Sequence, residues 1–293
     1  VVPDDRRQGA DIWISKKDSE GARDGDLVLC EVTAPPQKDF FAKGKVVKIL
    51  GDREDPGIDA DLVIGEFGVQ VDFSPGALAE AGAFPEEIDP EERRRRRDLK
   101  HVAFVTIDGL TAKDFDDAVA VEELGNGKQR LYVAIADVAH YVRKGSPLDE
   151  DASERATSVY LPGRVVPMLP ERLSNDLCSL KPNVDRLALC AAMDLDAQGN
   201  VTEYGIDRVV FRSRARMTYD DVHAILVDKR PDLLDRYKPL VPMFERMHEL
   251  MKVLRAKRFG QGSIDFDLPE PEIILDLTGA TTDIVKAPRY VSH

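Results

Sequence analysis

The 293-residue sequence has no apolar run that approaches the roughly 18 uninterrupted residues needed for a membrane helix. Its first residues, Val1 to Asp5, contain neither a basic segment nor an apolar segment, which argues against a signal peptide. The three cysteines, Cys30, Cys178 and Cys190, are far apart and form no C-x-x-C pair, so neither a disulfide framework nor a zinc knuckle is expected. These absences predict a cytoplasmic protein with reduced, buried thiols. The sequence also lacks an initial Met, so we expect an internal piece of a longer protein.

An excess of basic residues is also missing, because 41 Lys and Arg stand against 54 Asp and Glu, a net charge of −13. Residues 1–92 hold 10 basic and 22 acidic side chains, whereas residues 93–293 are almost neutral. Charge alone argues against a nucleic-acid partner, since phosphate binding needs a basic surface. Acidic side chains that hold metal ions weaken this objection, because they stop repelling a polyanion once the metal is bound.

The first 75 residues alternate between short apolar runs and turn residues. Expected strands at residues 11–15, 26–32 and 43–51 are separated by Gly-Asp, Pro-Pro and Asp-Pro-Gly turns. This spacing predicts a small Greek-key barrel of the OB type, assigned to residues 1–80. Such a barrel can offer aromatic and basic side chains to a single strand, although Trp13 fits the core equally well. The other candidates for this surface are Arg6, Arg7, Lys16 and Lys17.

Residues 76–92 are rich in Pro, Glu and Ala and predict a short helix and a linker, with the linker assigned to residues 81–97. Five consecutive arginines, Arg93 to Arg97, follow Glu91 and Glu92. They could contact phosphates, but we favour a solvated helix face whose arginines pair with the preceding acids at i, i+4.

From residue 98 the expected strands become longer. An apolar run at residues 101–107 predicts a strand, and runs at 118–124 and 130–138 flank Gly125-Asn126-Gly127, a hairpin signal. A second pair, residues 187–195 and 201–211, flanks Gly199-Asn200. Apolar side chains from Leu240 to Leu254 recur at helical spacing, with Gly260 expected just past the helix end and the methionines expected in the core. The second region is therefore predicted to be α+β, with a mostly antiparallel sheet.

Four aspartates lie within ten residues: Asp108, Asp114, Asp116 and Asp117. The segment runs from the end of one expected strand, through a loop, into the next, so the four carboxylates can converge. Close convergence would raise their pKa values through mutual repulsion unless a cation were bound. Without a nearby His or Cys, the hard oxygen donors favour Mg²⁺ or Mn²⁺. Two such ions can support phosphodiester hydrolysis.

Other interpretations of the aspartate segment are weaker. An EF-hand would need a glycine at the sixth and a glutamate at the twelfth loop position, and both are missing. A phosphatase-type D-x-D nucleophile fits loosely, and a solvated acidic turn is the default for an isolated cluster. The apolar strands on both sides and Phe115 argue against that default. The histidines are scattered and no G-x-S-x-G is present, so a nucleophilic triad is not supported.

Several motifs, in this order along the chain, resemble the catalytic domain of the ribonuclease II/ribonuclease R family. The segment around Val2-Pro3-Asp4-Asp5-Arg6-Arg7 and Asp11-Ile12-Trp13-Ile14 is similar to the second cold-shock domain of the family's bacterial ribonuclease R branch. The matching catalytic-domain motifs are Ile107-Asp108-Gly109, Lys113-Asp114-Phe115-Asp116-Asp117-Ala118, Val133-Ala134-Ile135-Ala136-Asp137-Val138, Thr157-Ser158-Val159-Tyr160-Leu161-Pro162, Pro167-Met168-Leu169-Pro170 and Leu173-Ser174-Asn175-Asp176-Leu177-Cys178-Ser179-Leu180.

The resemblance implies an α+β chain in which a cold-shock β-barrel precedes the N-terminal part of a ribonuclease II catalytic domain at residues 98–293. It implies a processive, Mg²⁺-dependent 3′→5′ exoribonuclease that degrades single-stranded and structured RNA to 5′-mononucleotides, with Mn²⁺ as a possible substitute. Asp108, Asp114 and Asp117 would bind metal, and Asp116 would place a second metal or its water. Tyr160 and Phe266 would stack on the terminal bases.

The family's catalytic domain continues past position 293 with a glutamate-bearing helix and an arginine that stabilises the scissile phosphate, followed by an S1 domain. A first cold-shock domain would precede Val1. The expected partners are therefore RNA 3′ ends, the remaining catalytic segment and the S1 domain, with the ribosome and trans-translation machinery implied only by family analogy. No membrane partner is expected. The alternative function is an RNA- and metal-binding fragment that does not turn over substrate.

Overall fold

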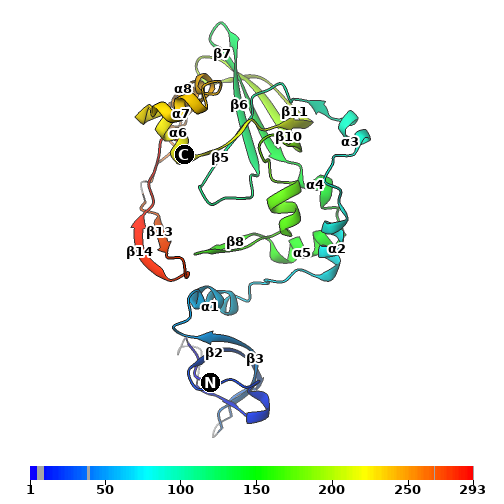
Figure 1. Cartoon of the computed structure of the whole chain (residues 1–293), viewed down its shortest axis with the longest axis vertical. Coiled ribbons are helices and arrows are strands. Elements are labelled where there is room, and N and C mark those ends of the chain that lie inside the picture. Colours follow the sequence, from blue (N-terminus) through cyan, green and yellow to red (C-terminus); the bar gives the residue numbers. More distant parts are fainter. Residues whose placement is uncertain (5–9, 38–39, 267, 293) are drawn as a thin grey trace. The chain divides into compact units, whose positions relative to one another are not determined.

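The computed structural model describes residues 1–4, 10–37, 40–266 and 268–292, which form two compact units. The first unit consists of Val1–Asp72, Val159–Val166 and Pro271–Val285, and the second of Phe73–Ser158, Pro167–Glu270 and Lys286–His293. Figure 1 colours the chain by sequence. No helix in these described stretches is long and apolar enough to cross a membrane.

A three-stranded sheet forms the N-terminal part of the first unit (Figure 1). Its strands are β1 (Ile12–Ile14), β2 (Asp26–Ala34) and β3 (Ala42–Asp52), in the order β1-β3-β2. β2 and β3 are antiparallel, whereas β1 runs parallel to β3. Along β3, the buried Ala42 and Val46 alternate with exposed lysines, which gives one face to the core. The three strands predicted from alternation are confirmed.

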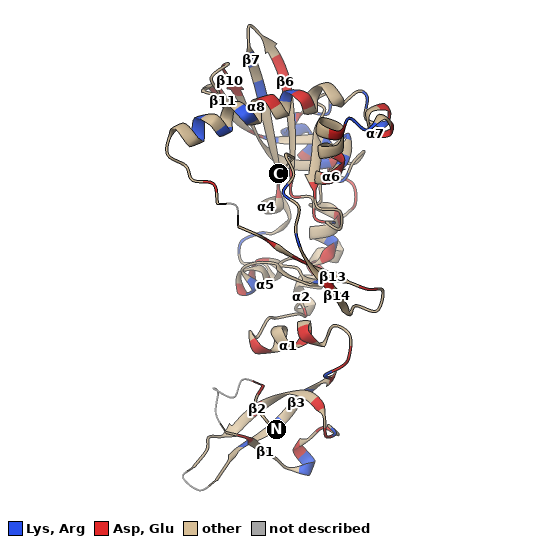
Figure 2. Cartoon of the chain, turned by 90° about the vertical axis from the view of Figure 1, so that its left-hand side faces the viewer, with Lys and Arg blue, Asp and Glu red and all other residues tan. Residues whose placement is uncertain are grey.

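Helix α1 (Ile58–Glu66) was not predicted from the sequence. Gly57, which precedes the helix, has the left-handed conformation at φ +82°. The negative charges of Asp59 and Asp61 in the first turn stabilise the helix by interacting with the partial positive charge at its N-terminus. All charged residues on α1 are acidic (Figure 2). Two hairpins complete the unit: β8 (Val159–Leu161) with β9 (Arg164–Val166), and β13 (Pro271–Leu275) with β14 (Thr281–Lys286).

A seven-stranded sheet is the centre of the second unit, in the order β12-β5-β6-β7-β10-β11-β4. The two hairpins predicted around Gly125-Asn126-Gly127 and Gly199-Asn200 are confirmed as antiparallel pairs. The strand expected from residue 101 begins only at Val105, because residues 99–102 form a turn closed by a hydrogen bond from Val102 N–H to the Leu99 carbonyl. The strands are β4 (Arg97–Asp98), β5 (Val105–Asp108), β6 (Asp117–Gly125), β7 (Lys128–Ala136), β10 (Asp185–Leu195), β11 (Val201–Arg212) and β12 (Ala215–Thr218).

Helices pack against this sheet around an aromatic core. The rings of Phe104 and Phe211 lie 4.6 Å apart, and that of Tyr132 lies 5.8 Å from Phe104. Burial of such rings is a major stabilising contribution in any domain of this size. The helices are α2 (Pro75–Ala83), α3 (Pro90–Arg95), α4 (Val138–Tyr141), α5 (Pro147–Arg155), α6 (Tyr219–His223), α7 (Pro231–Arg236) and α8 (Val241–Gly260), with two π-helical segments, η3 (Leu173–Leu177) and η4 (Ala224–Asp228).

Helix α8 confirms the helical spacing of its apolar residues. Met243, Phe244 and Leu250 are buried, and Met247 packs partly buried against the core, as predicted. Met251 is only half-buried. The expected position of Gly260 is wrong, because it is the last helical residue and its φ is not positive. The left-handed residue that follows is Gly262, at φ +92°, so the chain turns away two residues later than predicted.

The five arginines do not form one solvated face, which corrects the sequence interpretation. Arg94 and Arg95 are solvated, each lying 3.8 Å from Glu91 in an exposed pair, at i, i+3 and i, i+4 respectively. Arg96 makes the expected i, i+4 pair with Glu92, but its side chain is buried. Arg93 and Arg97 pair instead with acids on the sheet, Asp185 and Asp207. These long-range pairs attach the α3 region to β10 and β11.

Arg96 is the exception in burial, since only 1% of its side chain is exposed. Its guanidinium lies 2.7 Å from Glu92 and 2.6 Å from Asp137. Two carboxylates around one buried guanidinium satisfy the charge that burial would otherwise leave unpaired. Arg96 therefore connects α3 to the end of β7.

We expect Arg96→Met to lower the free energy of unfolding by about 3–5 kcal/mol, because two partly buried carboxylates lose their counter-charge. Urea denaturation measures this change. The matched variant Arg95→Met removes an exposed pair and should change stability by no more than about 0.5 kcal/mol. Equal effects of the two variants would contradict a special role for the buried guanidinium.

Candidate metal and RNA site

The four aspartates lie on and between two paired strands, as the sequence predicts. Asp108 is the last residue of β5 and Asp117 the first of β6. The strands are antiparallel neighbours, with Val105 opposite Val119. Asp114 and Asp116 lie in the connection between them. We call residues 109–116 the aspartate loop. The pairing of β5 with β6 holds the two ends of this loop in one sheet.

The carboxylates of this site are electrostatically coupled. Burial is the main reason that the pKa of Asp108 is raised to about 6, and the negative charges of Asp117 and Asp114 raise it further. The pKa of Asp116 is also raised, first by partial desolvation and then by Asp114 and Asp117. The positive charge of Arg216 opposes the shift at Asp108. The site therefore carries more negative charge than its own residues neutralise.

The fit of these residues to a metal ion rests on an unsatisfied oxygen. Oδ2 of Asp108 is buried and makes no hydrogen bond with any residue the structure describes. A buried carboxylate oxygen without a donor is costly, and a hard divalent cation is the partner that this donor type accepts. Within the described ranges, however, no three His, Cys, Asp or Glu side chains come close enough together to hold a metal. The carboxylate oxygens are suitable ligands for a hard divalent cation, but the carboxylates are not gathered around one point.

Two residues beside the aspartates were not found from the sequence. Tyr219 follows β12, and burial raises the pKa of its phenol, with the charges of Asp108 and Asp117 adding to the effect. The guanidinium of Arg216 donates hydrogen bonds to the carbonyl oxygens of Gly109 and Leu110, at 2.6 and 2.7 Å. Only the parallel pairing of β12 with β5 brings both to the site. Neither residue lies in a motif that the sequence singled out.

The two candidate stacking residues are both solvent-exposed. Tyr160 lies on β8 of the first unit, opposite Val165, and is 66% exposed. Phe266 follows α8 in the second unit and is 70% exposed. A large exposed ring on an otherwise ordinary surface is available for base stacking. The aspartates belong to the second unit, so Tyr160 and the aspartates are on different units.

Trp13 is 56% exposed on β1, which makes the core interpretation of this side chain wrong. Lys16 and Lys17 follow it in an exposed 3₁₀ turn. Arg6 and Arg7, the other candidates for this surface, lie outside the described residues. The exposed ring next to two lysines is compatible with contact to a single strand.

Cys178, Cys190 and His140 do not add a reactive group. Burial raises the pKa of Cys178 to about 12 and that of Cys190 to about 11, so both stay protonated and unreactive at neutral pH. The cysteines are free. Burial lowers the pKa of His140, whose ring packs edge-on against Tyr141. The burial of Cys178 and Cys190 agrees with the prediction of buried thiols, whereas Cys30 is only partly buried.

Comparison with known proteins gives matches over the whole chain. Residues 96–293 match the RNB domain family and residues 1–74 the cold shock domain family. Ribonuclease R of Aquifex aeolicus is 42% identical over 293 residues, which are 100% of this chain and 41% of that protein. The chain thus spans about two fifths of this curated relative.

Comparison with solved structures also finds RNase R proteins. Mycoplasma genitalium RNase R in complex with ribose-methylated single-stranded RNA has a TM-score of 0.87 at 29% identity, covering 96% of this chain and 44% of that one. Its complex with double-stranded RNA gives the same TM-score and identity, with 50% of that chain covered. Yeast Ssd1, described as a pseudonuclease, reaches a TM-score of 0.64 at 19% identity over 80% of this chain and 29% of that one, which shows the fold alone.

The RNB match covers more than half of the chain, and the cold-shock match covers the region in which short strands were predicted. The expected α+β architecture, with a cold-shock domain followed by a ribonuclease II-type domain, is confirmed. The resemblance to the ribonuclease II/R family is confirmed as well. This chain belongs to the RNB domain family and carries a cold shock domain ahead of its RNB domain.

Proposed function

We propose that this chain is part of a hydrolytic 3′→5′ exoribonuclease that degrades single-stranded and structured RNA processively to 5′-mononucleotides. The single observation that carries the proposal is the likeness over 96% of the chain to an RNase R solved with single-stranded RNA. We keep residues 1–80 as the cold-shock domain, 81–97 as the linker and 98–293 as the front of the catalytic domain. RNA 3′ ends are the proposed substrate.

We propose that Asp108, Asp114 and Asp117 hold Mg²⁺ and that Asp116 places a second ion or its water. The raised pKa values of Asp108 and Asp116 support this assignment, because a bound cation would offset the burial that mainly raises them and the repulsion between carboxylates that adds to it. Bound Mg²⁺ ions supply charge stabilisation for the attacking and leaving oxygens of phosphodiester hydrolysis. The aspartates orient these ions, and Arg216 limits the net negative charge near Asp108.

We also propose that Tyr160 and Phe266 stack on RNA bases near the 3′ end. Stacking on an aromatic ring contributes about 1–3 kcal/mol per base and is insensitive to base identity. The exposure of both rings supports this role. Such stacking suits an enzyme that must hold any sequence.

The alternative function is an RNA- and metal-binding chain that does not cut. The chain's 41% share of its Aquifex aeolicus relative keeps this alternative open, and so does a pseudonuclease with the same fold. Incubation with 5′-labelled single-stranded RNA, with Mg²⁺ or with EDTA, separates the two functions on a gel. Metal-dependent shortening from the 3′ end supports the exoribonuclease, and bound but intact RNA supports the alternative.

Asp116→Asn is expected to lower the rate of hydrolysis by about 100-fold or more while leaving RNA affinity nearly unchanged, because the carboxylate would place the second ion or its water and would not itself bind the RNA chain. The gel assay and a filter-binding titration measure the two effects. Asp235→Asn, an exposed change on α7, is the matched control. Loss of both activities together would make Asp116 a structural residue.

Asp108→Asn is expected to stabilise the metal-free protein more at pH 8 than at pH 4. The folded-state pKa of about 6 lies above the ordinary value of 3.8, so the wild type loses stability as the pH rises from about 4 through 6. The introduced amide has no charge to desolvate, so the stability of the variant does not fall with pH in this way. Melting temperatures in EDTA at both pH values measure the difference. A difference between variant and wild type that does not change with pH would contradict the raised pKa.

Tyr160→Ala is expected to change the length of the shortest oligonucleotide that remains after digestion, because the last bases lose a stacking partner. Denaturing gels of the end products measure this length. Tyr204→Ala removes a ring that is 72% exposed on β11 and should leave the end product unchanged. An unaltered end product for both variants would refute a stacking role for Tyr160.

A further inference from the structure

The end of the aspartate loop is attached to a segment more than 60 residues away. The buried hydroxyl of Ser179 donates to the carbonyl oxygen of Lys113 at 2.8 Å and accepts from the N–H of Phe115 at 3.1 Å. The N–H of Leu180 donates to the carbonyl oxygen of Phe115, also at 2.8 Å. Three hydrogen bonds thus fix the backbone of Lys113 and Phe115, which flank Asp114.

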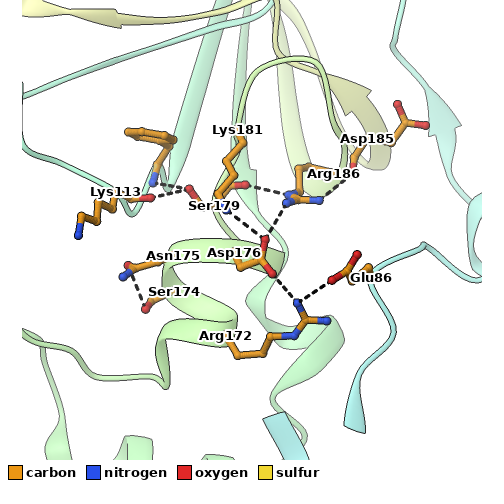
Figure 3. Close-up of polar contacts among 11 residues, drawn as sticks. Glu86, Lys113, Arg172, Ser174, Asn175, Asp176, Ser179, Lys181, Asp185 and Arg186 are labelled. Carbon is orange, nitrogen blue, oxygen red and sulfur yellow. Dashed lines mark hydrogen bonds and ion pairs between the residues drawn. The ribbon is translucent and has the colours of Figure 1, made fainter. Parts of the chain in front are cut away.

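Ser179 is itself held by a charged network (Figure 3). The guanidinium of Arg186, which is 6% exposed, donates from Nε to the Ser179 carbonyl oxygen at 2.8 Å. Asp176 lies 3.5 Å from Nη2 of Arg186 and 3.1 Å from the ammonium of Lys181, and it also pairs with Arg172. The network thus fixes the backbone of Ser179 through Arg186, and the buried hydroxyl is fixed by its own bonds to Lys113 and Phe115.

The start of the loop is attached to β12 through Arg216. Its Nη2 donates to the carbonyl oxygens of Gly109 and Leu110, the two residues after Asp108. The same guanidinium lies 5.5 Å from the centre of the Phe115 ring. Arg216 therefore contacts both the first residues of the loop and the residue that Ser179 fixes near its end.

Phe115 connects the two attachments. Its ring is 8% exposed and packs in the core of the second unit, while its backbone lies between Asp114 and Asp116. Fixing this residue restricts the positions from which both carboxylates project. Restricting them before a metal binds avoids the entropic cost of ordering the loop during binding.

We propose that Ser179 and Arg216 are positioning residues: they fix the backbone of the aspartate loop, so that only the aspartate side chains would have to move to bind a divalent metal. The inference rests on the proposed function, because it names residues that act through the same aspartates. Neither residue has to touch the metal or RNA. Partners of this kind, one step away from the ligands, commonly change metal affinity by about 10–100-fold when they are removed.

The test compares Ser179→Ala and Arg216→Met with matched controls from the same region. Ser213→Ala removes another buried hydroxyl, which donates to the Ala215 carbonyl oxygen at 3.2 Å. Arg214→Met removes another guanidinium that donates to a backbone carbonyl, that of Lys100, at 2.8 Å. These two side chains donate to residues outside the aspartate loop, so the controls report the general effect of losing a buried serine or an arginine.

Two measurements on the whole chain test whether Ser179 and Arg216 position the aspartate loop. Mn²⁺ affinity by electron paramagnetic resonance reports the metal site without needing turnover, and amide hydrogen exchange of the peptide 109–117 in EDTA reports the loop alone. We expect Ser179→Ala and Arg216→Met to weaken Mn²⁺ binding by about 10-fold or more and to speed exchange in this peptide. The controls should resemble the wild type. Arg216→Lys keeps a charged donor and should restore part of the affinity.

Unchanged exchange in both variants, or equal acceleration by the controls, would overturn the inference. Faster exchange without any loss of Mn²⁺ affinity would also overturn it, because the loop would then not need positioning. A wild type that binds no Mn²⁺ would instead refute the proposed function, while the exchange rates would still decide whether Ser179 and Arg216 hold the loop. If Arg216→Met fails to fold, Ser179→Ala and Arg216→Lys carry the comparison.

Discussion

Four carboxylates, on and directly beside the aspartate loop, lie near enough to repel one another while the protein remains folded without a metal. Their repulsion, added to partial burial, is visible in the raised pKa values of Asp108 and Asp116. The chain opposes that repulsion with backbone hydrogen bonds at both ends of the loop and with the single positive charge of Arg216. Hydrogen bonds from β12 and from the segment around Ser179 hold the backbone of the loop that carries Asp114 and Asp116.

Charge is distributed differently in the two units. The acidic excess of the first third of the sequence is carried on exposed surfaces such as α1, whereas arginines of the second unit are used in long-range pairs with the sheet (Figure 2). Arg96 is the most buried of these and joins α3 to the end of β7. Most arginines around α3 are therefore used in ion pairs within the fold. The positive surface that remains for binding phosphates is smaller than the number of arginines suggests.

Exposed rings provide a route to nucleic acid that does not depend on net charge. Trp13 on β1, Tyr160 on β8 and Phe266 after α8 are all more than half exposed. Stacking these rings on bases contributes binding free energy that does not depend on charge. Such a contribution suits a chain with a net charge of −13, which favours few contacts to phosphates. Under the proposed function, a metal at the aspartates would add positive charge beside the RNA backbone.

Local patterns in the sequence determined the two hairpins, helix α8 and the position of the four aspartates between adjacent strands, because turn residues and apolar spacing act over a few residues. The family motifs also pointed to Tyr160 and Phe266. Tertiary structure decided the exposure of Trp13, the burial of Arg96 and the contacts of Ser179 and Arg216 with the aspartate loop. Those contacts join residues 64 to 107 positions apart. No periodicity in the sequence encodes them, since strand pairing and core packing alone bring such segments together.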